Sequence, residues 1–213
     1  MGLTIHYNGK IKSPSLIPEL IHEVEDICRT MNWKHQTIDR VLKGVPEDYV
    51  NLLGITPGEG YRAHGISFQV HKDAESVMLS FGPDGRTLSP MALYRPDLTD
   101  WADDMLAHYS FTKTQFAGPE AHAAVCRLMK YLAGKYFLYL EVSDEGDFYE
   151  TENMAALERK FNAYGDAVDQ VANAISKADL KKVTSVPDLL NMLTKALPGM
   201  DIRVVGDMTA EEE

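Results

Sequence analysis

The chain has 213 residues, 45% of them hydrophobic, which is enough to bury a core without disulfides or metals. Its 32 acidic and 21 basic residues give a net charge of −11, which repels nucleic-acid phosphates and anionic membrane surfaces. Two cysteines, no leader pattern and no apolar run near the roughly 20 residues of a membrane helix predict a cytoplasmic globular protein with no nucleic-acid or membrane partner.

The first part of the chain predicts a strand, a helix and a second strand. Polar and apolar residues alternate over residues 3–8, as in a half-buried strand, and apolar residues recur at helical spacing over residues 17–31. A weaker strand is expected over residues 33–39. The mixed segment that follows, residues 40–64, is rich in glycine and proline near its end, and we interpret it as an insertion or flap.

A three-stranded meander is expected next. Residues 66–70 and 77–81 carry alternating apolar side chains on either side of a polar connection, which is typical of an antiparallel hairpin. The turn Pro83-Asp84-Gly85 leads to a third strand expected over residues 87–93. An acidic segment, residues 97–104, then leads to a strand-like run over residues 106–116.

That run ends at the best-defined junction in the sequence, residues 113–122. Gly118 and Pro119 suit the N-cap and the first position of a helix, and an apolar stripe follows them as far as residue 136. A strong strand is expected directly afterwards, over residues 137–142, because aromatic and aliphatic residues alternate there.

The rest of the chain predicts mainly helix. A long helix over residues 152–177 is followed by a short helix after Pro187 and a last strand over residues 202–205. We therefore divide the chain into an α+β domain (1–150), a C-terminal helical extension (151–206) and an acidic disordered tail (207–213).

The predicted fold class is α+β, with a mainly antiparallel sheet of six or seven strands and two amphipathic helices on one face. A His-Tyr pair, a basic strand end, a proline and an apolar helix occur twice, from His6 and again from His108. This recurrence indicates two strand-helix-strand halves, although short matches between common residues also arise by chance.

Three stretches resemble a group of small bacterial proteins that have no assigned function. They are the opening residues 2–7, the turn at residues 83–85 and the junction at residues 113–122, and the match covers most of residues 1–165. The resemblance implies no activity and no functional residue. The element order is also similar to folds of paired strand-helix-strand-strand units, some of which bind small molecules in a central groove, but fold does not imply function.

The junction is the first candidate ligand site. Backbone N–H groups at the helix start, assisted by Lys113 and Gln115, could hold a carboxylate or phosphate. Glu120 in the first turn argues against phosphate, and ordinary helix capping explains Gly118 equally well.

His122 and Cys126 lie four residues apart and so share one helix face, where they could form a thiolate pair or two metal ligands. Core packing accounts for Cys126 equally well. The seven histidines show no metal-binding spacing, and the acid-rich stretch from Asp144 has its glycine misplaced for a calcium loop, which favours a solvated loop. We predict no metal and no other cofactor.

Glu141 is expected in mid-strand, on the face that carries Phe137 and Tyr139. If that face lines a groove, the carboxylate could bind a cationic ligand over aromatic rings or act as a general base. If the face meets solvent, Glu141 is an ordinary polar position.

The long helix carries a narrow apolar seam with heptad spacing. Its partner could be internal, namely the first helix or the helix after Pro187, or it could be a second subunit in a homodimer. The seam consists of Leu157, Phe161, Tyr164, Val168, Val171 and Ile175.

The sequence favours a non-catalytic protein that binds a small ligand or a partner, with a homodimer as one of its forms. The alternative is a hydrolase or transferase with a groove at the junction, which would require several polar side chains to converge. The ligand-binding candidates are Lys113, Gln115, Gly118, His122 and Glu141.

Overall fold

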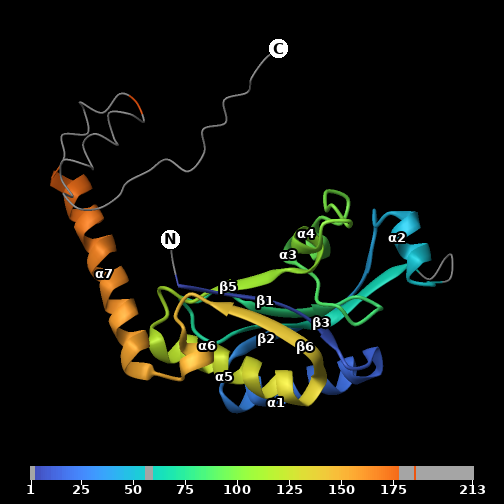
Figure 1. The fold of residues 1–213 in the computed structure, drawn as a ribbon, viewed down its shortest axis with the longest axis horizontal. Coiled ribbons are helices and arrows are strands. Elements are labelled where there is room, and N and C mark those ends of the chain that lie inside the picture. Colours follow the sequence, from blue (N-terminus) through green and yellow to red (C-terminus); the bar gives the residue numbers. More distant parts are fainter. Residues whose placement is uncertain (1–2, 56–59, 178–184, 186–213) are drawn as a thin grey trace. The chain divides into compact units, whose positions relative to one another are not determined.

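The computed structural model describes residues 3–55, 60–177 and 185 of the chain (Figure 1). The chain divides after Phe161 into two compact units, and every described strand belongs to the first. This boundary falls inside the last described helix, whereas the sequence placed it after residue 150. None of the described helices is both long and apolar enough to cross a membrane.

The expected α+β class is confirmed, because the first unit contains both helices and antiparallel strands. In chain order the elements are β1 (Thr4–Ile11), the short 3-10 helix η1 (Pro14–Leu16), α1 (Ile17–Thr30), β2 (Lys34–Leu42), α2 (Glu47–Leu52), β3 (Tyr61–Gln69), β4 (Val77–Phe81), α3 (Pro90–Tyr94), α4 (Asp104–His108), β5 (Ser110–Lys113), α5 (Pro119–Tyr136), β6 (Phe137–Asp144), α6 (Phe148–Thr151) and α7 (Met154–Lys177).

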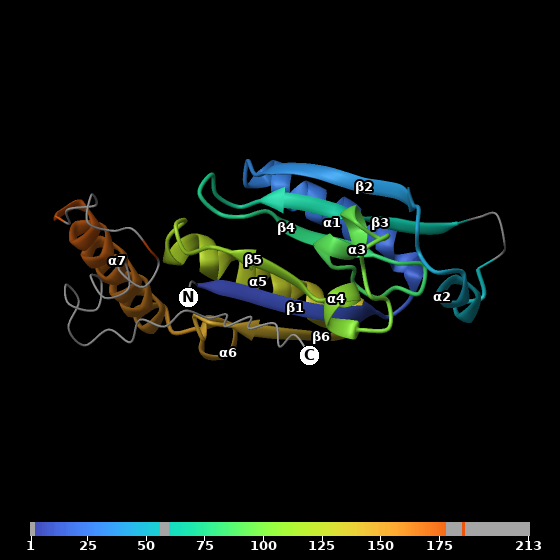
Figure 2. The same ribbon diagram turned by 90° about the horizontal axis from the view of Figure 1, so that it is seen from above.

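The strands form two antiparallel sheets of three strands each, ordered β5-β1-β6 and β2-β3-β4 (Figure 2). The predicted hairpin is confirmed, because Ile66 of β3 pairs directly with Leu79 of β4. An isolated bridge between Lys10 and Arg86 links the end of β1 to the segment that follows β4.

A buried hydroxyl joins the two sheets. Tyr7 of β1 is fully buried, and its hydroxyl accepts a hydrogen bond from the Met78 N–H at 3.0 Å and donates one to the Met78 carbonyl at 2.9 Å. Met78 belongs to β4, in the other sheet. Burial raises the pKa of Tyr7 to about 12, so the hydroxyl keeps its proton at neutral pH.

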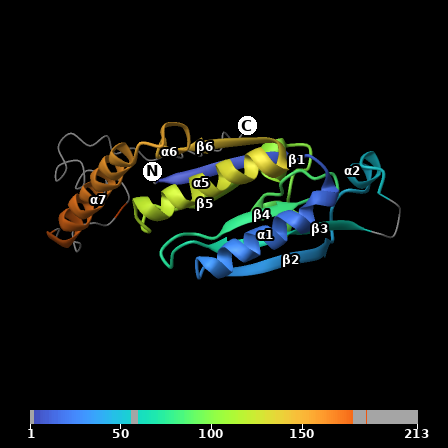
Figure 3. The same cartoon turned by 90° about the horizontal axis from the view of Figure 1, so that it is seen from below.

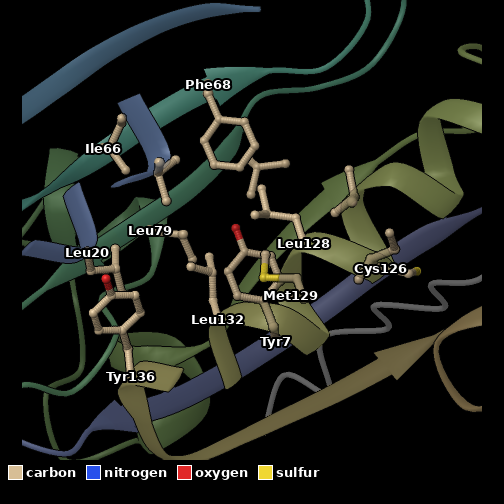
Figure 4. Close-up of a cluster of buried hydrophobic side chains, with 14 of the residues drawn as sticks. Tyr7, Leu20, Ile66, Phe68, Leu79, Cys126, Leu128, Met129, Leu132 and Tyr136 are labelled. Atoms are coloured by element: carbon tan, nitrogen blue, oxygen red, sulfur yellow. The ribbon is translucent and has the colours of Figure 1, made fainter. Parts of the chain in front are cut away.

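The two long amphipathic helices cover the same side of the two sheets, as predicted (Figure 3). α1 lies over β2-β3-β4 and α5 lies over β5-β1-β6, and we call this side the inner face. Leu20 of α1 and Leu132 of α5 are fully buried against Ile66 and Tyr7 in one continuous core (Figure 4). Burial of such apolar side chains contributes roughly 1.5–3 kcal/mol each.

The opposite, outer face differs between the two sheets. A second apolar cluster, including Tyr61 of β3, Leu93 of α3 and Trp101, covers the outer face of β2-β3-β4. The Trp101 ring lies 5.2 Å from that of Tyr61 and 5.1 Å from that of Tyr49. Within the described part of the first unit, α4 is the only helix beside the outer face of β5-β1-β6, and it lies at one end (Figures 1 and 2).

Two expected strand segments proved wrong because helix capping prevails there. Residues 90–94 form α3 and do not belong to a third meander strand, since Pro90 occupies its first turn and the Ser89 hydroxyl caps the Ala92 N–H at 3.0 Å. Residues 106–108 belong to α4, whose N-cap Asp103 accepts from the Met105 N–H at 2.8 Å. The strand-like run is therefore reduced to β5 at residues 110–113.

Glu23 of α1 ties the two long helices together. Its carboxylate accepts hydrogen bonds from the Tyr131 and Tyr136 hydroxyls and from Lys135 Nζ at 2.8 Å, all three on α5. Partial burial by itself would raise the pKa of Glu23. The hydrogen bonds from Lys135 and the two tyrosines outweigh it and lower the pKa to about 2.

This depressed pKa predicts an acid-sensitive contribution to stability. The unfolded carboxyl titrates near its usual 4.5, so the stabilisation is complete above that pH and is lost as the pH falls towards 2. Urea unfolding should show Glu23→Gln less stable than the wild type by about 1 kcal/mol at pH 6, since the group is partly exposed, with little difference at pH 2.5. Glu158→Gln, on exposed α7 surface, is the control. An equal deficit for Glu23→Gln at both pH values would contradict this account.

Candidate functional site

The junction folds as the capping chemistry predicts. Gly118 is the N-cap of α5 with φ of 89°, a left-handed conformation that favours glycine, and Pro119 follows in the first turn with Glu120. Lys113 ends β5 opposite Thr4, and its N–H donates to a carboxylate oxygen of Glu75 at 3.0 Å. The helix start is therefore an ordinary capped end beside a paired strand.

His122 lies inside the protein. Its side chain is fully buried, with Nδ1 2.7 Å from the Thr114 hydroxyl and Nε2 2.7 Å from Asp144 Oδ1. Both nitrogens of the ring are thus engaged, and because a carboxylate only accepts, Nε2 carries a proton. Cys126, one turn further along α5, places its Sγ 3.6 Å from the other oxygen of Asp144. We call these four residues the buried cluster.

Asp144 is the centre of the buried cluster, and the expectation of a solvated acidic loop is wrong for it. Its side chain is 2% exposed, whereas the neighbouring Glu145 and Asp147 are exposed as expected. The backbone N–H groups of Gly146, at 2.6 Å, and Tyr149, at 2.8 Å, donate to the two carboxylate oxygens. The loop after β6 is thereby folded back onto α5.

The pKa values in the buried cluster follow from this geometry. Burial alone would raise the pKa of Asp144, but the hydrogen bond and charge attraction from His122 and the two backbone donors lower it to about 2. Burial, and secondly the negative charge of Asp144, raise the pKa of the Cys126 thiol. Cys126 is therefore a protonated, unreactive thiol in this arrangement.

Glu141 occupies a different place, on the outer face of the β5-β1-β6 sheet. It pairs with Asn8 of β1, and Tyr139 pairs with Lys10, so Tyr139 and Glu141 project from the same face. They line a pocket of about 370 Å³ between this face and α4, which we call the Glu141 pocket. Its lining consists of Asn8, Arg86, Met105, His108, Tyr109, Tyr139 and Glu141.

Hydrogen bonds hold two polar parts of this lining. Asn8 Nδ2 donates to Glu141 Oε2 at 3.0 Å, while the Glu141 side chain stays exposed. His108 is 2% exposed; its Nδ1 donates to the Thr87 carbonyl at 2.7 Å and its Nε2 lies 3.1 Å from the Tyr49 hydroxyl. The His108 side chain is therefore held in place on one side of the pocket, and the Glu141 carboxylate, elsewhere in the lining, is exposed to solvent.

Phe137 does not share the face of Tyr139 and Glu141, which corrects the simple alternation expected for this strand. Phe137 is buried in the inner core, 3% exposed. The register between β1 and β6 shifts so that Ile11 pairs with Phe137 while Lys10 pairs with Tyr139, which leaves Leu138 as an extra residue. Such a bulge turns Phe137 inwards.

The structure therefore separates the predicted ligand residues. Lys113 and Glu141 both flank β1, but opposite Thr4 and Asn8, four residues or about 13 Å apart along the strand. His122 approaches from α5 on the inner face. Gln115 is half-buried in the turn after β5. Of the five candidates, Glu141 alone lines the pocket described above.

The seam on the long helix divides at the unit boundary. Leu157 is fully buried in the core of the first unit, and the Phe161 ring packs edge-on to His122 with centroids 5.8 Å apart. The start of the seam thus packs into the core of the first unit, beside α5. Tyr164 is half-buried and Val168 is 45% exposed. Outside the described residues lie the side chains of Val171 and Ile175, the expected helix after Pro187, the strand at residues 202–205 and the tail.

Comparison with known proteins finds no matching family model, no matching curated protein and no matching solved structure.

The buried cluster makes a direct prediction about stability. Asp144→Asn removes the charge that His122 and two backbone donors stabilise in a buried position, so urea unfolding should show a loss of roughly 3 kcal/mol. Asp147→Asn, whose carboxylate pairs with Lys160 at 2.5 Å on the exposed surface, is the matched control and should cost less than about 1 kcal/mol. Equal losses for the two variants would show that the buried carboxylate has no special role.

Proposed function

We propose that the protein binds a small cationic molecule in the Glu141 pocket without catalysing a reaction. The observation that carries this proposal is the exposed Glu141 carboxylate beside the Tyr139 ring, in a hollow of about 370 Å³ on the outer face of the β5-β1-β6 sheet. Carboxylates and aromatic rings both bind ammonium ions in proteins.

The charges of the pocket indicate what such a molecule would look like. Glu141 favours an amine or quaternary ammonium group, and Tyr109 and Tyr139 supply aromatic surface for it. Arg86 lines the same pocket, and the five N–H donors of a guanidinium group can serve more than one partner. A ligand with a cationic group at Glu141 and a polar or acidic group towards Arg86 fits best.

Binding without chemistry is favoured by the composition of the lining. It contains no serine, threonine or cysteine nucleophile, and the ring nitrogens of its His108 are held by Thr87 and Tyr49. The alternative hydrolase or transferase at the junction requires Lys113, Gln115 and His122 to meet one substrate. The burial of His122 and the outward direction of Lys113 do not support that arrangement.

The ligand hypothesis can be tested with a pair of probes that differ in charge. Tetramethylammonium and its neutral isostere tert-butanol would be titrated by NMR into the wild type, Glu141→Gln and the charge control Glu158→Gln. We expect the ammonium ion to shift signals of the pocket in the wild type and the control. Glu141→Gln should bind it at least about tenfold more weakly, a loss of about 1.4 kcal/mol.

Two outcomes would refute this function. One is equal binding of tetramethylammonium and tert-butanol by the wild type, because the carboxylate then contributes nothing. The other is unchanged affinity in Glu141→Gln while Glu158→Gln reduces it, because the cation then binds through general surface charge.

A homodimer through the distal part of α7 stays a prediction from the seam. Leu157 and Phe161 pack within the first unit, so a second subunit would have to use Tyr164, Val168 and the residues beyond them. Light scattering of the full chain should give twice the mass of one chain, and Val168→Asp should shift it towards the single-chain mass. A single-chain mass for the wild type at high concentration would exclude this dimer.

A further inference from the structure

We propose that His122, Cys126 and Asp144 form a binding site for one soft divalent metal ion, with Zn²⁺ as the best match. The three side chains offer an imidazole nitrogen, a sulfur and a carboxylate oxygen, and these donor atoms all lie within 4.8 Å of one another. Nitrogen, sulfur and oxygen donors of these types are the protein ligands of zinc. No short sequence motif shows this set, because Asp144 comes from the end of β6.

The Cys126–Asp144 distance matches that of a tetrahedral site, and the His122–Asp144 distance is shorter than in one. Ligands at zinc distances of 2.0–2.3 Å lie about 3.3–3.7 Å from one another. Cys126 Sγ and Asp144 Oδ2 are 3.6 Å apart, which already fits. His122 Nε2 and Asp144 Oδ1, at 2.7 Å, would have to separate by about half an ångström once the ion replaces the proton between them.

Outer hydrogen bonds orient two of the three ligands as metal sites require. The Thr114 hydroxyl, 3.2 Å from the Leu3 carbonyl, can donate to that carbonyl and accept from His122 Nδ1, which points Nε2 at Asp144. The Gly146 and Tyr149 N–H groups fix the carboxylate. Partners of this kind typically change metal affinity by about 10- to 100-fold.

The exchange of protons for the ion balances in charge. With the Thr114 hydroxyl donating to Leu3, the His122 ring carries protons on both nitrogens, Cys126 is a thiol and Asp144 is a carboxylate, so the site is neutral. A divalent ion would replace the Nε2 proton and the thiol proton, which leave to solvent. The net charge of the site is then again zero, from a neutral imidazole, a thiolate, a carboxylate and a doubly positive ion. The loaded site therefore buries no unbalanced charge.

This site is independent of the proposed ligand pocket. Asp144 and Glu141 are three residues apart on β6, so their side chains project from opposite faces of the sheet. The metal site lies on the inner face with α5, and the Glu141 pocket lies on the outer face with α4. Failure of either proposal therefore leaves the other untouched.

The test uses the full chain, stripped with a chelator and then loaded with Co²⁺ or Zn²⁺ both by incubation and during refolding, because the cluster is buried. Bound metal is counted after gel filtration, and the Co²⁺ form is examined for the near-ultraviolet absorption of a thiolate–cobalt bond. Variants are Cys126→Ser and, as a matched control, Cys28→Ser, which alters the other buried cysteine, on α1.

We expect about one ion per chain and the thiolate–cobalt band in the wild type and in Cys28→Ser. Cys126→Ser should lose the band and bind Zn²⁺ at least about tenfold more weakly, while its circular dichroism stays that of the wild type. No stoichiometric metal in the wild type under either loading protocol would overturn the proposal. So would a band that survives in Cys126→Ser.

Discussion

The hydroxyl of Tyr7 forms hydrogen bonds with both the N–H and the carbonyl of Met78, and this pair of bonds ties β1 to a strand of the other sheet. The two sheets share the core under α1 and α5, so their relative position decides whether the core side chains pack together and exclude water. A fully buried phenol without partners would cost about 1–3 kcal/mol, which makes the pairing strongly favoured once the core has formed. β1 is thereby fixed on three sides, by β5, β6 and β4.

Both candidate sites follow from this fixed position of β1. Its alternation sends Ile5 and Tyr7 into the inner core and sends Asn8 to the outer face, where Asn8 positions the Glu141 carboxylate. β6 is paired along almost the whole of β1, so its residues alternate in the same way. Glu141 therefore reaches the pocket, while Asp144, three residues further on, reaches α5. A register slip of one residue would exchange these two environments.

Local patterns predicted much of this fold and some of the site. The buried stripe of α5, its Gly-Pro start and the face of Glu141 could be derived from spacing alone, because helix and strand periodicities are properties of short segments. Residues 90–93 were assigned to a strand wrongly, since the Ser89 cap and Pro90 start a helix there. The weight of these two residues against an alternating pattern is hard to judge from the sequence. Pairing of Asp144 with His122 spans 22 residues and depends on how β6 ends beside α5. No segment-level rule contains that information, and the bulge that buries Phe137 was missed for the same reason.

The sequence contained one usable signal for the buried cluster, namely the alternation of side chains along β6. His122 and Cys126 share the buried side of α5, and a buried imidazole needs hydrogen-bond partners or a metal for its two nitrogens. The acid-rich stretch after the next strand was the nearest source of an acceptor, but density of acidic residues normally marks a solvated loop. Leu140 and Val142 of β6 both pack against the inner core. Asp144 is the only acidic residue of β6 that the same alternation points inwards. Extending the inward–outward alternation of the strand from its apolar residues to the polar ones that follow would thus have distinguished the buried acid from its exposed neighbours.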